Sequence, residues 1–86
     1  MLDKERINIS EVIEIKAGEW HYLADERSIA IVTDAKPWIF AHCNLLALTE
    51  IIDNYMDNAL DVSPEGSTIS MIANSVDSNI ELIVRD

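Results

Sequence analysis

The chain has 86 residues, which is enough for one small domain with a modest core, and its two glycines and two prolines argue against disorder. Sixteen acidic residues against six basic ones give a net charge of −10, which argues against nucleic acid or an anionic membrane as a direct partner, because phosphate binding requires clustered Lys and Arg. A nucleotide held through Mg²⁺ stays compatible with this charge, since the cation prefers carboxylate and amide oxygens.

A single cysteine, Cys43, excludes an internal disulfide, and the sequence has neither an apolar run that could span a bilayer nor the apolar core of a signal peptide. We therefore expect a cytoplasmic protein. A membrane anchor for the full protein would lie in a segment outside this sequence.

The first half of the chain predicts a strand at residues 6–10, a helix at 11–26 and extended segments at 28–34 and 38–42, with a turn at 35–37. Ser10 is the expected N-cap of the helix, and Glu11 and Glu14 favour the positive end of its dipole. Apolar residues at helical spacing give this helix one buried face: Ile13, Ala17, Trp20, Leu23 and Ala24.

The second half predicts a helix at residues 44–61, with Asn44 as its cap, and then alternating strands at 68–74 and 79–86 around a polar turn. Pro64 and Gly66 favour a tight loop between the helix and the first of these strands. At 100° per residue, six residues form the expected core stripe of the helix: Leu45, Leu48, Ile52, Tyr55, Met56 and Ala59. The element order predicts an α+β fold of two layers, with a mixed sheet covered on one face by two helices.

On the opposite side of the second helix lie Asn54, Asn58 and Asp61. One interpretation is a plain solvated face. Such faces are normally built from Glu, Lys, Gln and Arg, which keep helix propensity, whereas residues 44–61 contain no Lys or Arg. Amide and carboxylate oxygens in this arrangement also suit a hydrated Mg²⁺ that carries phosphate, and spacing alone leaves both interpretations open.

The stretch "NYMDNALDVSPEG" resembles the N box of the ATP-binding domain of sensor histidine kinases, in the superfamily that includes the ATPase domains of gyrase, Hsp90 and MutL-type proteins. The match falls on Asn54, Asn58, Ala59, Pro64 and Gly66. The final "ELIVRD" resembles the strand and aspartate that begin the family's first glycine box. Upstream, "INISEVIEI" and "SIAIVTD" resemble the family's first strand and helix start and its second strand.

This resemblance implies a nucleotide site and no catalytic residue within the chain. Asn58 would be the Mg²⁺ ligand that bridges the metal and the triphosphate, and Asn54 would face the phosphates or a metal-bound water. Asp86 would accept a hydrogen bond from the adenine amino group. Asp61 and Val62 occupy positions where relatives often carry a basic or aromatic residue, and the acidic Asp61 departs from that pattern. Because gyrase-type relatives carry a catalytic Glu at the position of Asn54, the resemblance favours the kinase branch.

The resemblance also implies that residues 1–86 form a single partial domain, an incomplete Bergerat-type fold without the ATP lid and the second glycine box. The full protein would use ATP and Mg²⁺ to phosphorylate a histidine in a phosphorelay, with a helical phosphoacceptor domain and a response regulator as partners, both absent here. We expect the fragment itself to be inactive, to bind ATP very weakly or not at all, and to self-associate through an exposed sheet edge or face. The alternative is a small protein-interaction module that retains the fold without nucleotide binding.

Overall fold

The computed structural model describes residues 3–76 and 79–85, and their elements follow the order that the sequence predicts. The α+β class is confirmed, with two long helices and five strands among these residues. The elements are β1 (Glu5–Asn8), α1 (Ile9–Glu26), β2 (Ala30–Ala35), β3 (Phe40–Cys43), α2 (Leu45–Val62), β4 (Thr68–Val76) and β5 (Asn79–Arg85). Of the predicted turn at residues 75–79, residues 77–78 lie outside the described residues, while residues 75–76 belong to β4 and residue 79 to β5.

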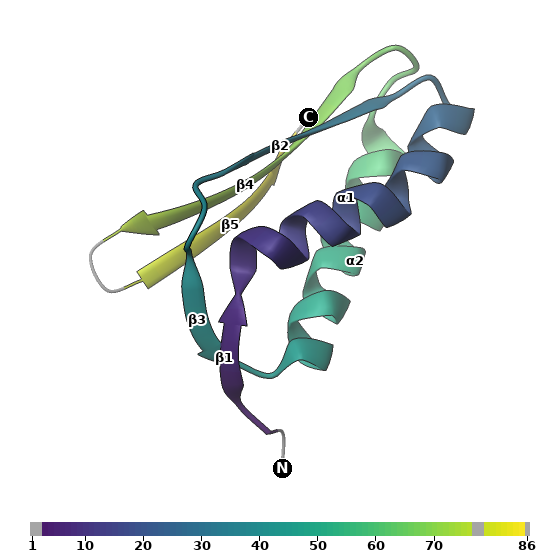
Figure 1. The fold of residues 1–86 in the computed structure, drawn as a ribbon. Coiled ribbons are helices and arrows are strands. Elements are labelled where there is room, and N and C mark those ends of the chain that lie inside the picture. Colours follow the sequence, from purple (N-terminus) through teal and green to yellow (C-terminus); the bar gives the residue numbers. More distant parts are fainter. Residues whose placement is uncertain (1–2, 77–78, 86) are drawn as a thin grey trace.

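The strands form two separate ladders. A mixed three-stranded sheet has the order β2-β4-β5, with β2 parallel to β4 and β5 antiparallel to it. β1 and β3 pair antiparallel as a second, two-stranded ladder. Figure 1 shows α1 and α2 on the same side of the three-stranded sheet, which gives the two expected layers.

The hydrophobic core lies between the helices and the sheet. In β4, Ile69, Met71 and Ala73 alternate toward the helices, and all three side chains are buried. Ile72 points to the other face of the sheet, where its cross-strand partners are Asp34 and Ile83. Both helices therefore lie over the face of β4 that carries Ile69, Met71 and Ala73.

The start of α1 differs from the prediction. Asn8, not Ser10, is the N-cap, and its side-chain oxygen accepts a hydrogen bond from the Glu11 N–H at 3.2 Å. Ser10 lies inside the first turn and donates its hydroxyl to the Lys36 carbonyl. The helix starts earlier because Ile9 is buried there, 2% exposed, and Asn is as good a cap as Ser. The predicted N-cap of α2 is confirmed, since the Asn44 side chain accepts a hydrogen bond from the Ala47 N–H at 2.8 Å.

The buried stripe of α2 is rotated relative to the predicted one. Its fully covered residues follow a strict four-residue row: Leu48, Ile52, Met56 and Leu60. Leu45 and Tyr55, which the wheel placed in the core, are 41% and 46% exposed. The row of i, i+4 side chains is the ridge that packs best against a neighbouring helix, and α1 supplies that neighbour.

The side chain of Arg27 connects the C-terminal ends of the two helices by hydrogen bonds. Its guanidinium donates to the carbonyl of Leu60 and, at 3.1 Å, to that of Ser63. Carbonyls in the last turn of a helix have no partner within the helix, so Arg27 satisfies groups that would otherwise face water. Gly66 then turns the chain with φ of +85°, as its predicted role in the loop requires, and its N–H donates to Ser28.

Candidate functional site

A cavity of about 530 Å³ lies between α2 and β5. Five of its lining side chains are apolar or aromatic, and Asn58 is the one amide among them. A cavity of this size with apolar walls and one polar group is typical of a small-molecule site. The lining residues are Tyr55, Asn58, Ala59, Val62, Leu82 and Val84.

The structure separates the predicted site residues into two groups. Asn58 and Val62 line the cavity. Asn54 and Asp61 are exposed on α2 and are not among the lining residues. The predicted contact of Asp86 lies outside the described residues. The structure thus brings together two of the four described candidates, both on the side of α2 that faces β5.

Four lining residues were missed by the sequence reasoning. Tyr55 was assigned to the core, although in the structure it faces the cavity. Leu82 and Val84 lie on the helix-facing side of β5, and the period-two alternation of that strand could have indicated them. Ala59 borders the cavity because α2 turns its buried row toward α1 and leaves this flank facing β5.

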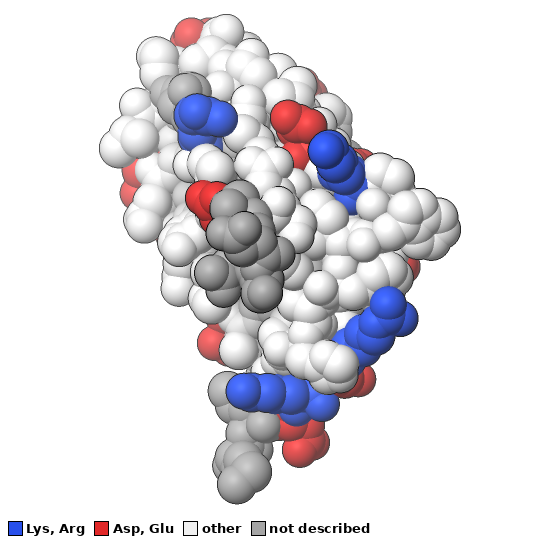
Figure 2. All heavy atoms as spheres, turned by 90° about the vertical axis from the view of Figure 1, so that its left-hand side faces the viewer, with Lys and Arg blue, Asp and Glu red and all other residues white. Residues whose placement is uncertain are grey.

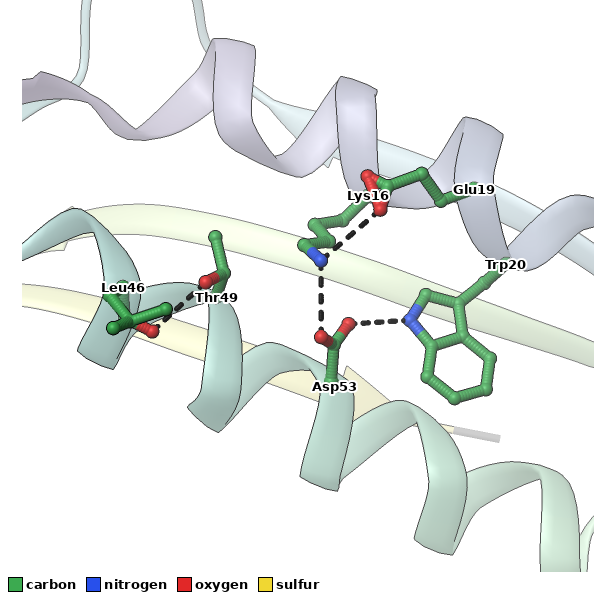
Figure 3. Close-up of polar contacts among 6 residues, drawn as sticks. All are labelled: Lys16, Glu19, Trp20, Leu46, Thr49 and Asp53. Atoms are coloured by element: carbon green, nitrogen blue, oxygen red, sulfur yellow. Dashed lines mark hydrogen bonds and ion pairs between the residues drawn. The ribbon is translucent and has the colours of Figure 1, made fainter.

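A polar bridge between the helices holds α2 in place beside the cavity. Lys16 donates to Asp53 at 3.1 Å and to Glu19 at 3.2 Å, while the Trp20 indole N–H donates to the second oxygen of Asp53 at 2.8 Å. Figure 3 shows Lys16 and Trp20 reaching from α1 to the same carboxylate on α2, that of Asp53. Because Asp53 lies on α2, this bridge restrains the rotation of the helix that carries Asn58.

The environment of Lys16 shifts its acidity. Burial lowers the pKa of the Lys16 ammonium, but the hydrogen bonds and charges of Asp53 and Glu19 outweigh burial, so the pKa lies above its usual 10.5. The Lys16 side chain is only 12% exposed. A raised pKa in the folded state means that folding favours the protonated form.

The stability that Lys16 contributes should therefore be present below pH 10.5 and be lost as the pH rises through the higher folded-state pKa. The measurement is urea unfolding of the wild type and of Lys16→Met from roughly pH 8 to 12. The difference in unfolding free energy should be constant at first and shrink at the alkaline end. A difference that does not change over this range would contradict the role given to the charged form.

The distribution of charged side chains and of possible metal ligands limits the kinds of molecule that the cavity can bind. Figure 2 shows basic side chains scattered singly over the face that lies on the left-hand side of Figure 1, not gathered into a patch. Within residues 3–76 and 79–85, no three His, Cys, Asp or Glu side chains gather where they could hold a metal ion. A Mg²⁺ here would therefore depend on an amide such as that of Asn58 and on phosphate oxygens. No described helix combines the length and apolar character that crossing a membrane requires.

Comparison with known proteins identifies the fold. No family model matches the sequence, and neither does any curated protein. Among solved structures, the nucleotide-free catalytic domain of histidine kinase ThkA superposes with a TM-score of 0.90 at 12% identity, over 96% of this chain and 57% of that one. The cytoplasmic segment of histidine kinase QseC gives 0.79 at 22% identity, over 84% and 48%. Histidine kinase AdeS of Acinetobacter baumannii gives 0.84 at 18% identity, over 98% and 42%.

The chain therefore has the fold of histidine kinase catalytic domains, and at this level the resemblance in its sequence is confirmed. It spans about half the length of these three structures. At such low identities the likeness establishes architecture, while activity and ligands have to be argued from the site.

Proposed function

We propose that residues 1–86 are the front part of the ATP-binding catalytic domain of a bacterial two-component sensor histidine kinase. The observation that carries the proposal is Asn58: the second asparagine of the N-box pattern lines an otherwise apolar cavity in a fold of this class. In the full protein, this domain would serve the transfer of the ATP γ-phosphoryl group to a histidine on a helical domain, and from there to a response regulator. The domain would lie in the cytoplasm.

The residues that line the cavity have some of the chemistry that binding Mg-ATP requires. The apolar walls from Val62, Leu82 and Val84 suit a purine base, and the amide of Asn58, which lines the same cavity, would serve as the ligand toward Mg²⁺ and phosphate. The metal would supply neutralisation of the phosphate charges. Asn54 would act through water, and Asp86 would select the adenine amino group.

A direct test is the titration of the isotope-labelled chain with Mg-ATP, followed by NMR. We expect dissociation constants in the millimolar range, a binding free energy of roughly −4 kcal/mol, with the largest shifts at the amides of Leu82 and Val84. Asn58→Ala should remove the response. It should also stabilise α2 by up to about 0.7 kcal/mol, because Ala is the better helix former. The loss of response would then be attributable to the site and not to unfolding.

The matched control is Asn74→Ala, which removes an exposed asparagine from β4 and does not touch the cavity. It should leave the titration unchanged. An Asn58→Ala variant that responds like the wild type would remove Asn58 from the site. A micromolar dissociation constant for the wild type would contradict the expectation that this part of the domain binds weakly alone.

The second candidate is a protein-interaction module that keeps the fold without nucleotide. Asp61 favours it, because an exposed carboxylate in the last turn of α2, one residue before the cavity-lining Val62, opposes the approach of phosphate. A wild-type chain that gives no shifts with Mg-ATP at any concentration would support this candidate.

A further inference from the structure

Trp38 lies in the loop between β2 and β3, and 78% of its surface is exposed. Its backbone has a φ of +71°, in the left-handed region. This region is unfavourable for a bulky side chain and is normally occupied by glycine or asparagine. The chain therefore keeps a large aromatic ring in solvent at a position where a smaller residue would relieve strain, which is a combination typical of binding sites.

Two hydrogen bonds hold this loop against the start of α1 (Figure 1). The Ser10 hydroxyl donates to the Lys36 carbonyl, and the Ile9 N–H donates to the Ile39 carbonyl at 2.7 Å. The chain is thus attached to α1 on both sides of Trp38, and Ile39 is itself buried. Because the loop is already ordered, a ligand that contacts the ring does not have to order it.

A cavity of about 280 Å³ lies between this loop and the first turns of α1. Trp38 and Pro37 line it from the loop, Glu11 and Glu14 line it from α1, and its lining includes no Lys or Arg. We call it the Trp38 cavity. Its volume is just below the roughly 300–1,000 Å³ of small-molecule sites, so it suits a single side chain better than a nucleotide.

The two carboxylates make one side of the Trp38 cavity negative. The Thr33 hydroxyl donates to one oxygen of Glu14 at 2.6 Å, which orients this carboxylate and leaves its second oxygen for another donor. Among the described residues, neither Glu11 nor Glu14 forms an ion pair with Lys or Arg. An aromatic ring beside such carboxylates favours a cation, because the face of the ring attracts positive charge and the carboxylates accept its hydrogen bonds.

We infer that the Trp38 cavity binds an arginine side chain of a partner protein, with the guanidinium against the Trp38 ring and its N–H groups donating to Glu11 and Glu14. Arginine suits the site better than lysine, because its planar guanidinium stacks on aromatic rings, whereas an ammonium is compact and strongly hydrated. The chain forms one such contact internally, since the Arg6 guanidinium lies 4.0 Å from the centroid of the Phe40 ring. The net charge of −10 also favours a basic partner.

The Trp38 cavity is separate from the cavity between α2 and β5. No residue lines both of them. In the sheet, β4 lies between β2, which leads into the Trp38 loop, and β5, which borders the other cavity. The rest of the domain, which the proposed function places after β5, would continue from the opposite edge of the sheet.

The test is an NMR titration of the isotope-labelled chain with three matched peptides in salt at about 0.15 M, which screens attraction to the net charge. Acetyl-Gly-Arg-Gly-amide should shift the resonance of the Trp38 indole N–H, with a dissociation constant in the millimolar range. The Trp20 indole N–H, which donates to Asp53, is the internal control and should not move. The lysine peptide should bind roughly threefold more weakly, and the neutral citrulline peptide should give no shift.

Three variants assign the contacts. Trp38→Asn, which tolerates the left-handed backbone, should remove the shifts at the amides of Glu11 and Glu14 without lowering the midpoint of urea unfolding. Glu14→Gln, which keeps an acceptor for the Thr33 hydroxyl, should weaken binding of the arginine peptide roughly threefold. Glu26→Gln makes the same change in charge at an exposed position of α1 outside the cavity and should have little effect.

Three outcomes overturn the proposal: a Trp38 indole resonance that the arginine peptide does not shift, a lysine peptide that binds as tightly as the arginine peptide, or equal weakening by Glu14→Gln and Glu26→Gln. The last two would mean that the net charge alone attracts the peptide. Because the titration contains neither ATP nor Mg²⁺, its result is independent of the nucleotide titration.

Discussion

Met56→Ala should lower the free energy of unfolding by about 2–5 kcal/mol, the largest effect we expect from a single change in this chain. Met56 has no exposed surface and lies in the middle of the buried row of α2, which packs against α1 and the sheet. Truncation leaves a cavity that the surrounding aliphatic side chains fill only in part. For a domain of this size, whose total stability is expected near the lower end of about 5–15 kcal/mol, much of the chain should then be unfolded.

Urea unfolding followed by circular dichroism measures this effect, and the chain offers a matched control. Leu46→Ala removes a large apolar side chain from the same helix, but Leu46 is 64% exposed. It should change the unfolding free energy by no more than about 0.5 kcal/mol. Met56→Leu, which nearly conserves the volume, should cost less than about 1.5 kcal/mol. Equal losses for Met56→Ala and Leu46→Ala would mean that the buried row does not organise the fold.

The second large effect is expected at Asp53. Asp53→Ala removes the acceptor of both Lys16 and Trp20, so the ammonium of Lys16, 12% exposed, loses its partner on α2. Because the Asp53 side chain is itself 42% exposed, water offsets part of the loss, and we expect about 1–2 kcal/mol. Asp53→Asn keeps an oxygen for the Trp20 N–H and should cost less.

A double-mutant cycle with Trp20→Phe separates the indole hydrogen bond from the rest of the bridge. We expect a coupling energy of about 1 kcal/mol between residues 20 and 53. Asp57→Ala, which removes an exposed carboxylate from the next turn of α2, serves as the control and should be near neutral. Additive effects of Trp20→Phe and Asp53→Ala would show that the two side chains do not act together.

The sequence predicted much of this architecture because its local signals agree with the tertiary structure. The Asn44 cap, the break after α2 and the alternation in β4 each act over a few residues and need no knowledge of distant partners. The prediction was wrong at Ser10, where tertiary packing of the neighbouring Ile9 decided where the helix begins. The division of the strands into two ladders depends on contacts between distant segments, which periodicity does not report.

The candidate site was predictable only in part, for a geometric reason. Residues four apart on a helix differ by about 40° around its axis. Both asparagines are exposed, but Asn58 lines the cavity and Asn54 does not. Whether Asn54 or Asn58 lines the cavity depends on the rotation of α2 about its own axis relative to α1. The hydrogen bonds to Asp53 restrain that rotation. They come from Lys16, 37 positions earlier in the chain, and from Trp20, 33 positions earlier.

The link from Arg27 to the end of α2 also affects how the protein opens. Helix ends normally fray alone, with free energies of opening close to zero. Here the carbonyls of Leu60 and Ser63 are held by a side chain from the end of α1, so the last turn of α2 opens only when this contact between the two helices is released. Val62 and the loop that follows α2 therefore share the local stability of the α1–α2 pair, and one rim of the cavity stays ordered without a ligand.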